Sequence, residues 1–262
     1  MHQTNLPTAV AAESDHYVVV GPGGTLPRFM SVEEVGRGFG LEEESALMRM
    51  LTAPEVLTVN QAVACLGRGV HVGVARQVVM TLRARGHLRV GLRYGSSYSG
   101  IDTFAAGVDA VFGEDWKYTF ASERDPTSRA ALLSAWGARG LSAEACFEDA
   151  CTGGAVAAPC VDLWVCTPSC EAYSKRNHSR DAALQRSMLS DVWRSLEYVR
   201  RSRPRVVVLE NVTEPSVVGP VTGLLTRLKG YTVETGELDP RTCAGAPMAR
   251  TRQYWILTRV GE

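Results

Sequence analysis

The spacing of apolar positions changes near Gly86. Before it, apolar residues recur at helical intervals, most clearly at Val70, Val74, Val78 and Leu82. Ser31 and Glu34 form a capping-box pattern at the start of a short helix, and residues 41–51 continue the helical spacing. We therefore predict a small helical segment over residues 28–86, preceded by a loosely ordered tail, residues 1–27, that contains a strand-like run at 16–20.

After Gly86 short apolar runs alternate with longer amphipathic stretches, which is the pattern of a doubly wound α/β sheet. The predicted strands lie near residues 88–94, 117–122, 144–147, 162–166, 205–210, 231–237 and 253–259. The predicted helices lie near residues 102–111, 127–138, 181–201 and 216–228. Residues 87–262 are thus expected to form the main α/β unit, with the helical segment packed on it.

Composition narrows the class of protein. The chain has 262 residues, 45% of them hydrophobic, and its 28 basic and 28 acidic side chains balance to a net charge of zero. A polyanionic partner would therefore have to be bound by a local patch. No apolar run reaches membrane-spanning length and the N-terminus does not resemble a signal peptide, so we expect a cytoplasmic or nuclear protein without a membrane partner.

The seven cysteines do not form a recognisable framework. Their number is odd and no C-x-x-C pair occurs, which argues against both a disulfide scaffold and a zinc site. Five of them fall between residues 146 and 170, so the spacing alone does not exclude zinc. We expect no metal.

Ligands of open α/β sheets bind beyond the carboxyl ends of the strands, so the residues that follow each strand are the candidates. The first such turn, Tyr98–Asp102, contains small residues that let backbone approach a ligand. Glu123 ends the second strand, a position suited to gripping a ribose diol, although a solvated surface carboxylate is the alternative. Cys170 lies in a proline-stiffened loop after the fourth strand and is either a nucleophile or a small buried residue.

Two more strand ends carry charged groups. Glu210 directly follows four buried aliphatic residues, where a low dielectric raises a carboxyl pKa and suits the group to donate a proton; a helix-capping role is the alternative. Arg250 and Arg252 lie one residue apart before the last strand and should point to one side of it. They could hold an anionic loop or a backbone phosphate.

Together and in this order, these segments resemble the motifs of the cytosine-5 DNA methyltransferases: the Tyr98–Gly100 turn with Glu123, Pro168–Cys170, Glu210–Val212 and Arg250–Arg252. The resemblance implies a Rossmann-like fold with S-adenosylmethionine as cofactor and DNA as partner. It implies catalytic roles for Cys170, Glu210, Arg250 and Arg252. It also implies a cofactor site made of Tyr98, Ser99, Gly100, Ile101, Asp102, Glu123, Asp149, Ala150, Pro168, Gly67 and Val70, with Glu148 as an alternative to Asp149.

The motifs of this chain occur in an unusual order. Arg28–Glu34 looks like the penultimate motif of the family and Gln61–Val70 like the last, yet both precede all the others, so the chain looks circularly permuted. Several positions depart from the family pattern: Arg68, Asp102, Ser169, Glu171 and Met248. Because the nucleophile, the acid and both arginines are present, we expect an active enzyme.

The permuted order leaves little room for a target-recognition region, so we expect a second subunit or a homodimer to supply one. Two other functions stay open: a non-catalytic methyltransferase-like subunit, and an enzyme that methylates cytosine in RNA. Residues 175–205 carry nine basic and three acidic side chains. Their first part follows Cys170, where DNA would lie, whereas the part beyond Arg186 is interpreted as a solvated helix face.

Overall fold

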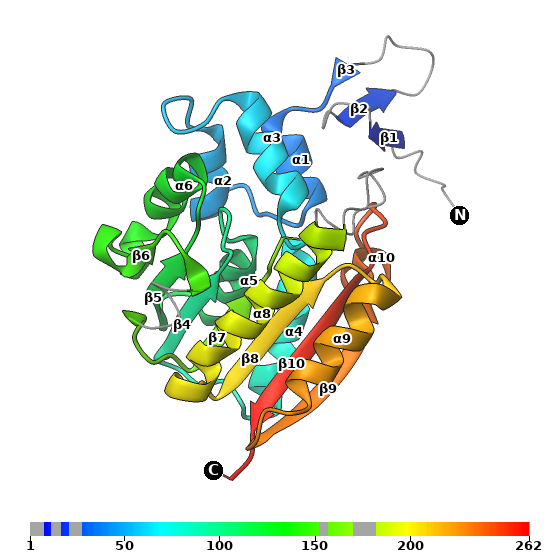
Figure 1. Cartoon of the computed structure of the whole chain (residues 1–262). Coiled ribbons are helices and arrows are strands. Elements are labelled where there is room, and N and C mark those ends of the chain that lie inside the picture. The colour runs from blue at the N-terminus through cyan, green and yellow to red at the C-terminus, as the bar shows by residue number, and fades with distance from the viewer. Residues whose placement is uncertain (1–7, 12–16, 21–27, 152–156, 170–181, 262) are drawn as a thin grey trace.

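A seven-stranded sheet organises the computed structural model, which describes residues 8–11, 17–20, 28–151, 157–169 and 182–261. The strand order is β6-β5-β4-β7-β8-β10-β9 (Figure 1). The strands are β4 (Leu92–Ser97), β5 (Trp116–Ser122), β6 (Cys146–Phe147), β7 (Leu163–Cys166), β8 (Val206–Asn211), β9 (Tyr231–Leu238) and β10 (Arg252–Arg259). The first five strands are parallel, whereas β10 runs antiparallel to both β8 and β9.

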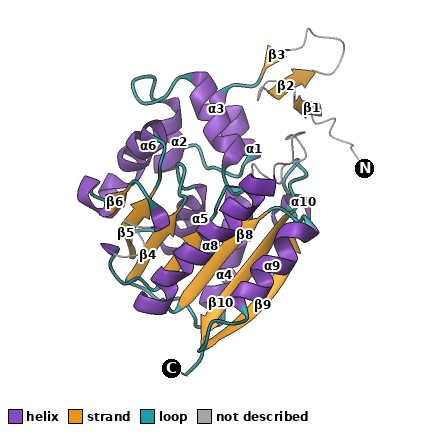
Figure 2. Ribbon diagram, in the orientation of Figure 1, coloured by secondary structure: helices purple, strands orange, loops and turns teal. Residues whose placement is uncertain are grey.

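Alternation along the strands divides the core into two layers. Leu163 and Val165 of β7 pack in one hydrophobic cluster, and Trp164 and Cys166 pack in the other. The first cluster is covered by α4 (Val72–Ala84), α5 (Thr103–Phe112) and α6 (Pro126–Trp136). The second is covered by α8 (Ala182–Ser202) and α9 (Pro215–Leu225) (Figure 2). The predicted doubly wound sheet is confirmed.

The N-terminal helices share the first of these clusters. They are α1 (Val32–Gly38), α2 (Ala46–Thr52) and α3 (Val59–Arg68), and the side chains of Leu47 and Leu66 are fully buried in this cluster. The predicted capping box of Ser31 and Glu34 is present at the start of α1. A separate antiparallel sheet is formed by β1 (Thr8–Ala11), β2 (Tyr17–Val20) and β3 (Arg28–Phe29).

The first core strand lies further along the chain than predicted. It was expected at residues 88–94 but spans 92–97, because Gly91 turns the chain with a φ of +76° and Ser96 and Ser97 continue the strand. Both serines are buried and hydrogen-bonded, which the polar sequence did not suggest. The short helix α10 (Pro240–Ala244), which precedes the arginine segment, was also not predicted.

Within the described residues, no helix combines the length and the apolar character needed to cross a membrane.

The close contact between α4 and α5 gives a test of the packing. A Cβ at Gly107 would lie 2.7 Å from both the Ala75 Cβ and the Arg76 backbone nitrogen. We expect Gly107→Ala to lower the free energy of unfolding by about 1–3 kcal/mol, since overpacking outweighs the gain of up to about 1 kcal/mol in helix propensity. Gly223→Ala in α9 is the matched control, because its Cβ would meet no atom within 4 Å, and it should be neutral or stabilising. Urea denaturation measures both; a stabilised Gly107→Ala protein would contradict the close contact.

Candidate active site

The turn after β4 has an unusual backbone. Tyr98, Gly100 and Asp102 have φ angles of +58°, +55° and +51°, and the Ser99 nitrogen donates a 3.0 Å hydrogen bond to the Ser122 carbonyl at the end of β5. The Gly100 N–H donates to Glu123 Oε2 at 2.7 Å, and the Asp125 N–H donates to the other carboxylate oxygen at 2.8 Å. The structure therefore brings the predicted turn and the predicted ribose-binding carboxylate into direct contact.

The side chain of Asp102 anchors this turn to the core. Its carboxylate is buried and accepts hydrogen bonds from the hydroxyls of Tyr94, at 2.9 and 3.0 Å, and of Tyr118, and from the Ala105 N–H at 3.0 Å, which makes it the N-cap of α5. Burial raises the pKa of Asp102, while these hydrogen bonds oppose the rise. The carboxylate is thus engaged in hydrogen bonds within the core. Of the neighbouring predicted residues, Ile101 is also buried, and its carbonyl accepts from the indole of Trp136 at 3.2 Å.

The acids after β6 differ in their surroundings. Glu148 is exposed and forms a 2.9 Å ion pair with Arg129, whereas Asp149 accepts a 2.6 Å hydrogen bond from the Cys151 N–H and is followed by the buried Ala150. The sequence left the choice between the two acids open. Because Glu148 is exposed and already paired with Arg129, the geometry favours Asp149 as a ligand-binding group.

The segment that leads to the predicted nucleophile is held by both neighbouring strands. Thr167 donates through its N–H to the Ser97 carbonyl at 3.2 Å and through its hydroxyl to the Tyr98 carbonyl at 3.0 Å. The Asn211 amide donates to the carbonyl of the buried Pro168 at 3.1 Å. Cys170 itself and Glu171 lie outside the described residues. The chain is therefore anchored beside β4 and β8 just before the predicted nucleophile.

Glu210 lies at the end of β8, beside an arginine from β10. It is buried, and Arg252 Nε lies 3.4 Å from its Oε1. Burial raises the pKa of Glu210, while the charges of Arg252 and Arg250 oppose the rise. A carboxyl with a raised pKa retains its proton to higher pH, which suits a group that donates a proton to a substrate. Glu210 is thus buried, as the sequence pattern indicated, and its role as a proton donor stays a prediction.

Arg250 joins the site to the N-terminal helices. Its Nη2 donates to the Gly69 carbonyl at 2.9 Å, and its guanidinium carbon lies 5.8 Å from the centre of the Phe39 ring. Gly69 in turn packs on Thr103, the first residue of α5, where a Cβ would come within 2.7 Å of the threonine side chain. The segment 67–70, with Gly67 at the end of α3 and Val70 buried, therefore lies between the Tyr98–Asp102 turn and Arg250.

Two groups of site neighbours were not predicted. His71, the N-cap of α4, contacts the Gly38 carbonyl through Nε2 and accepts from the Gly73 N–H through Nδ1, both at 3.1 Å; burial lowers the pKa of His71, which favours the neutral ring. The Tyr98 hydroxyl contacts Cys151 Sγ at 3.2 Å and the Ser195 hydroxyl at 3.1 Å. Neither group was predicted, because the contacts of His71 with Gly38 and of Tyr98 with Cys151 and Ser195 join residues that are distant in the chain.

Among the residues that the structure describes, no group of three or more histidine, cysteine or acidic side chains could hold a metal ion.

Comparisons with known proteins support the fold. No protein-family model and no curated protein matches the sequence. The structure is similar to that of NSun6 from Pyrococcus horikoshii crystallised with SFG, at a TM-score of 0.51 and 11% identity over 73% of this chain and 52% of that one. It also matches TrmN from Thermus thermophilus (TM-score 0.48, 18% identity, 72% and 49% covered) and the Dnmt2 methyltransferase of S. pombe (0.46, 20%, 65% and 52%).

Identities this low show the fold alone, which is the Rossmann-like fold of the S-adenosylmethionine-dependent methyltransferases. The matched part spans about half the length of these three proteins.

The buried carboxylate of Asp102 makes a testable electrostatic prediction. Tyr118→Phe removes one of its donors, so we expect the protein to lose about 1–3 kcal/mol of unfolding free energy. The donor stabilises the ionised form, so its removal raises the pKa of Asp102 further, and the loss should grow as pH rises through that pKa. Tyr198→Phe is the control, because that hydroxyl donates to the neutral Pro159 carbonyl at 2.7 Å and should give a loss independent of pH. The measurement is the unfolding free energy of the parent and both variants by urea denaturation between pH 4 and 8. If the losses in the two variants had the same pH dependence, an ionised Asp102 would be contradicted.

Proposed function

We propose that this protein transfers a methyl group from S-adenosylmethionine to C5 of cytosine in nucleic acid, with DNA as the favoured substrate. The observation that carries the proposal is the placement of the Gly100–Glu123 pair and the Glu210–Arg252 pair at the same edge of a methyltransferase-type sheet, on either side of β7. The first pair suits a cofactor ribose and the second suits a nucleobase.

The residues present fit the cofactor. A Cβ added at Gly100 would meet no atom within 4 Å, so the turn leaves space for a ligand to approach its backbone. Glu123, fixed by two backbone N–H groups, would hold the ribose hydroxyls, and Asp149 would accept from the adenine amino group. Pro168 and the segment 67–70 would border the same site. When bound, S-adenosylmethionine supplies an electrophilic methyl group.

The chain's own groups then account for activation of the base. Cytosine C5 is a poor nucleophile, so the Cys170 thiolate would add to C6 while Glu210 gives its proton to N3, which makes C5 electron-rich. After C5 has accepted the methyl group, water would take the C5 proton, the thiolate would be expelled from C6 and N3 would return its proton to Glu210, which restores the aromatic ring and the free enzyme. Arg252 would hold Glu210 in position. The target base would have to be flipped out of a duplex to reach these groups.

The contact of Arg250 with Gly69 supports the permuted order of motifs. The residues that resemble the last family motif lie against the arginine segment, although 181 positions separate the two in sequence. A chain that begins with this motif can therefore still complete the site. The same contact, with the buried Glu210–Arg252 pair, favours an enzyme over a non-catalytic subunit, because a binding module has no need of a carboxyl with a raised pKa.

Cofactor binding is tested by calorimetric titration with S-adenosylmethionine. We expect Glu123→Ala to weaken binding at least tenfold, about 1.4 kcal/mol, because the ribose loses a charged hydrogen-bond acceptor. Glu114→Ala is the matched control: it removes an exposed carboxylate of the same charge just beyond the end of α5 that is remote from the turn, and it should bind as the parent does. Equal losses in the two variants would remove Glu123 from the cofactor site.

The nucleophile is tested by transfer of a labelled methyl group to DNA and to RNA of the same sequence, followed by location of the label. We expect label at cytosine C5 in DNA, no transfer by Cys170→Ser, and parental transfer by Cys160→Ser, whose thiol is exposed outside the site. DNA that contains 5-fluorocytosine should trap a covalent adduct with the parent protein only. Transfer to RNA alone would identify RNA, not DNA, as the substrate. Transfer at the parental rate by Cys170→Ser would exclude Cys170 as the nucleophile.

A further inference from the structure

The edge of the sheet opposite the candidate active site gathers basic side chains from three parts of the chain. Helices α8 and α9 and strand β10 all end there, and β8 and β9 begin there. The Arg259 N–H donates to the Arg205 carbonyl at 3.0 Å and the Val260 N–H to the Gly230 carbonyl at 2.9 Å, so the three segments are directly joined. We define the basic edge as Arg194, Arg200, Arg201, Arg203, Arg205, Arg227, Lys229 and Arg259.

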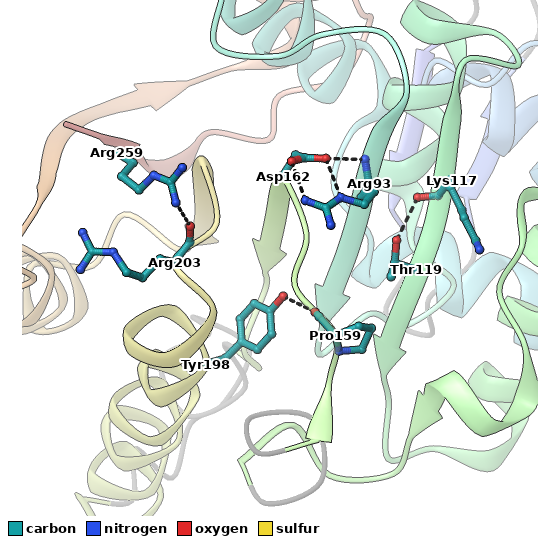
Figure 3. A network of polar contacts seen from close by, with 8 residues as sticks. All are labelled: Arg93, Lys117, Thr119, Pro159, Asp162, Tyr198, Arg203 and Arg259. Atoms are coloured by element: carbon teal, nitrogen blue, oxygen red, sulfur yellow. Dashed lines mark hydrogen bonds and ion pairs between the residues drawn. The ribbon is translucent and has the colours of Figure 1, made fainter. Parts of the chain in front are cut away.

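The charge of this edge is strongly one-sided. Residues 194–205, 226–231 and 258–261 contain these eight cations and one carboxylate, Glu197, although the whole chain is neutral. The neighbouring Asp162 is paired with Arg93 at 3.1 Å, as Figure 3 shows together with Arg203 and Arg259. Cations near a helix C-terminus complement the helix dipole, but that effect is confined to the last turn and needs one or two charges for each helix. The remaining like charges repel one another, so the dipoles of α8 and α9 do not explain them.

Arg203 is held in an unfavourable backbone conformation. It follows the last residue of α8 with a φ of +45°, a left-handed position that usually takes glycine, and Pro204 comes next. A Cβ at Gly230 would lie 2.5 Å from Arg203 Nη2, so the guanidinium crosses the glycine that precedes β9. The fold thus keeps an exposed arginine where glycine would be more stable.

An exposed tryptophan lies beside these charges. Trp193 projects from the outer face of α8 with 46% of its surface exposed, and the guanidinium carbon of Arg200 stacks 4.2 Å from its ring centre. Arg194 is its neighbour on the same exposed face. An aromatic ring among arginines is the combination that binds nucleic-acid strands, through base stacking and contacts with phosphate. An acidic protein surface would pair with the arginines but would have no base to stack on the tryptophan ring.

We propose that the basic edge and the outer face of α8 bind the phosphodiester backbone of the nucleic-acid substrate. Helix α8 begins at Ala182 on the active-site edge and ends at Ser202 on the basic edge, about 30 Å away by helix rise. A strand that leaves the active site along α8 would meet Trp193 and Arg194 first and then Arg203 and Lys229. The proposal rests on the proposed function for the identity of the substrate, but binding at this edge needs neither cofactor nor catalysis.

The experiment measures binding of fluorescein-labelled single-stranded DNA, duplex DNA and single-stranded RNA by anisotropy, without S-adenosylmethionine, between 50 and 300 mM salt. The test variant combines Arg194→Ala, Arg203→Gly and Lys229→Ala. None of these three side chains is hydrogen-bonded or ion-paired to another described residue, and glycine suits the left-handed position of residue 203. The control variant combines Arg49→Ala and Arg76→Ala on exposed faces of α2 and α4.

We expect the test variant to bind at least tenfold more weakly at 100 mM salt, and the slope of log affinity against log salt to fall by about two to three, the number expected for three lost phosphate contacts. The control should change either quantity little, and urea denaturation should show both variants folded. The nucleic acid bound most tightly by the parent identifies the strand type. Parental binding by the test variant, an equal loss in the control, or tighter binding of the parent to anionic lipid vesicles than to any oligonucleotide would overturn the proposal. A protein that shows the expected losses here but transfers no methyl group would overturn the proposed function and leave the basic edge standing.

Discussion

The buried carboxylate of Asp102 is the interaction on which the candidate site depends. A carboxylate removed from water without partners is strongly destabilising, yet here two tyrosine hydroxyls and one backbone N–H surround it. Tyr94 comes from β4, Tyr118 from β5 and Ala105 from α5, so one side chain joins two strands and a helix. Any shift of the Tyr98–Asp102 turn would leave these donors and the carboxylate unsatisfied. The turn, and with it the position of Glu123, is therefore fixed by the core.

A second set of contacts fixes the ends of the other strands at this edge of the sheet. Thr167 bonds to Ser97 and Tyr98, Asn211 bonds to Pro168, and Glu210 pairs with Arg252. Each bond joins neighbouring strands at the same edge of the sheet, so Glu210 and Arg252 are placed by strands rather than by long loops. Such placement limits their motion, which favours catalysis because geometry need not be recovered when a substrate binds.

Sequence patterns predicted the parts of the fold that depend on local periodicity. They missed the parts that depend on contacts between residues distant in the chain. Strands β5, β7, β8 and β10 are short, mostly buried apolar runs, and that local pattern was sufficient to place them. The shift of β4 was missed because Ser96 and Ser97 are polar in sequence and satisfied only by groups such as Tyr118 and Trp164. Likewise, the arginines of α8 were interpreted as a solvated face, since Lys229 and Arg259 join them only through the fold.

The placement of charge at the two edges bears on how the basic edge acts. At the active-site edge, Arg252 pairs with Glu210 and offsets its charge, whereas Glu123 accepts hydrogen bonds from two neutral backbone N–H groups and keeps its negative charge. The basic edge lies about 30 Å away along α8. The Debye length at physiological salt is about 8 Å, so its potential at the active site is reduced by screening to a few per cent of its unscreened value. Long-range steering of a substrate into the site is therefore weak, and the basic edge must act by direct contact with a strand long enough to reach both edges.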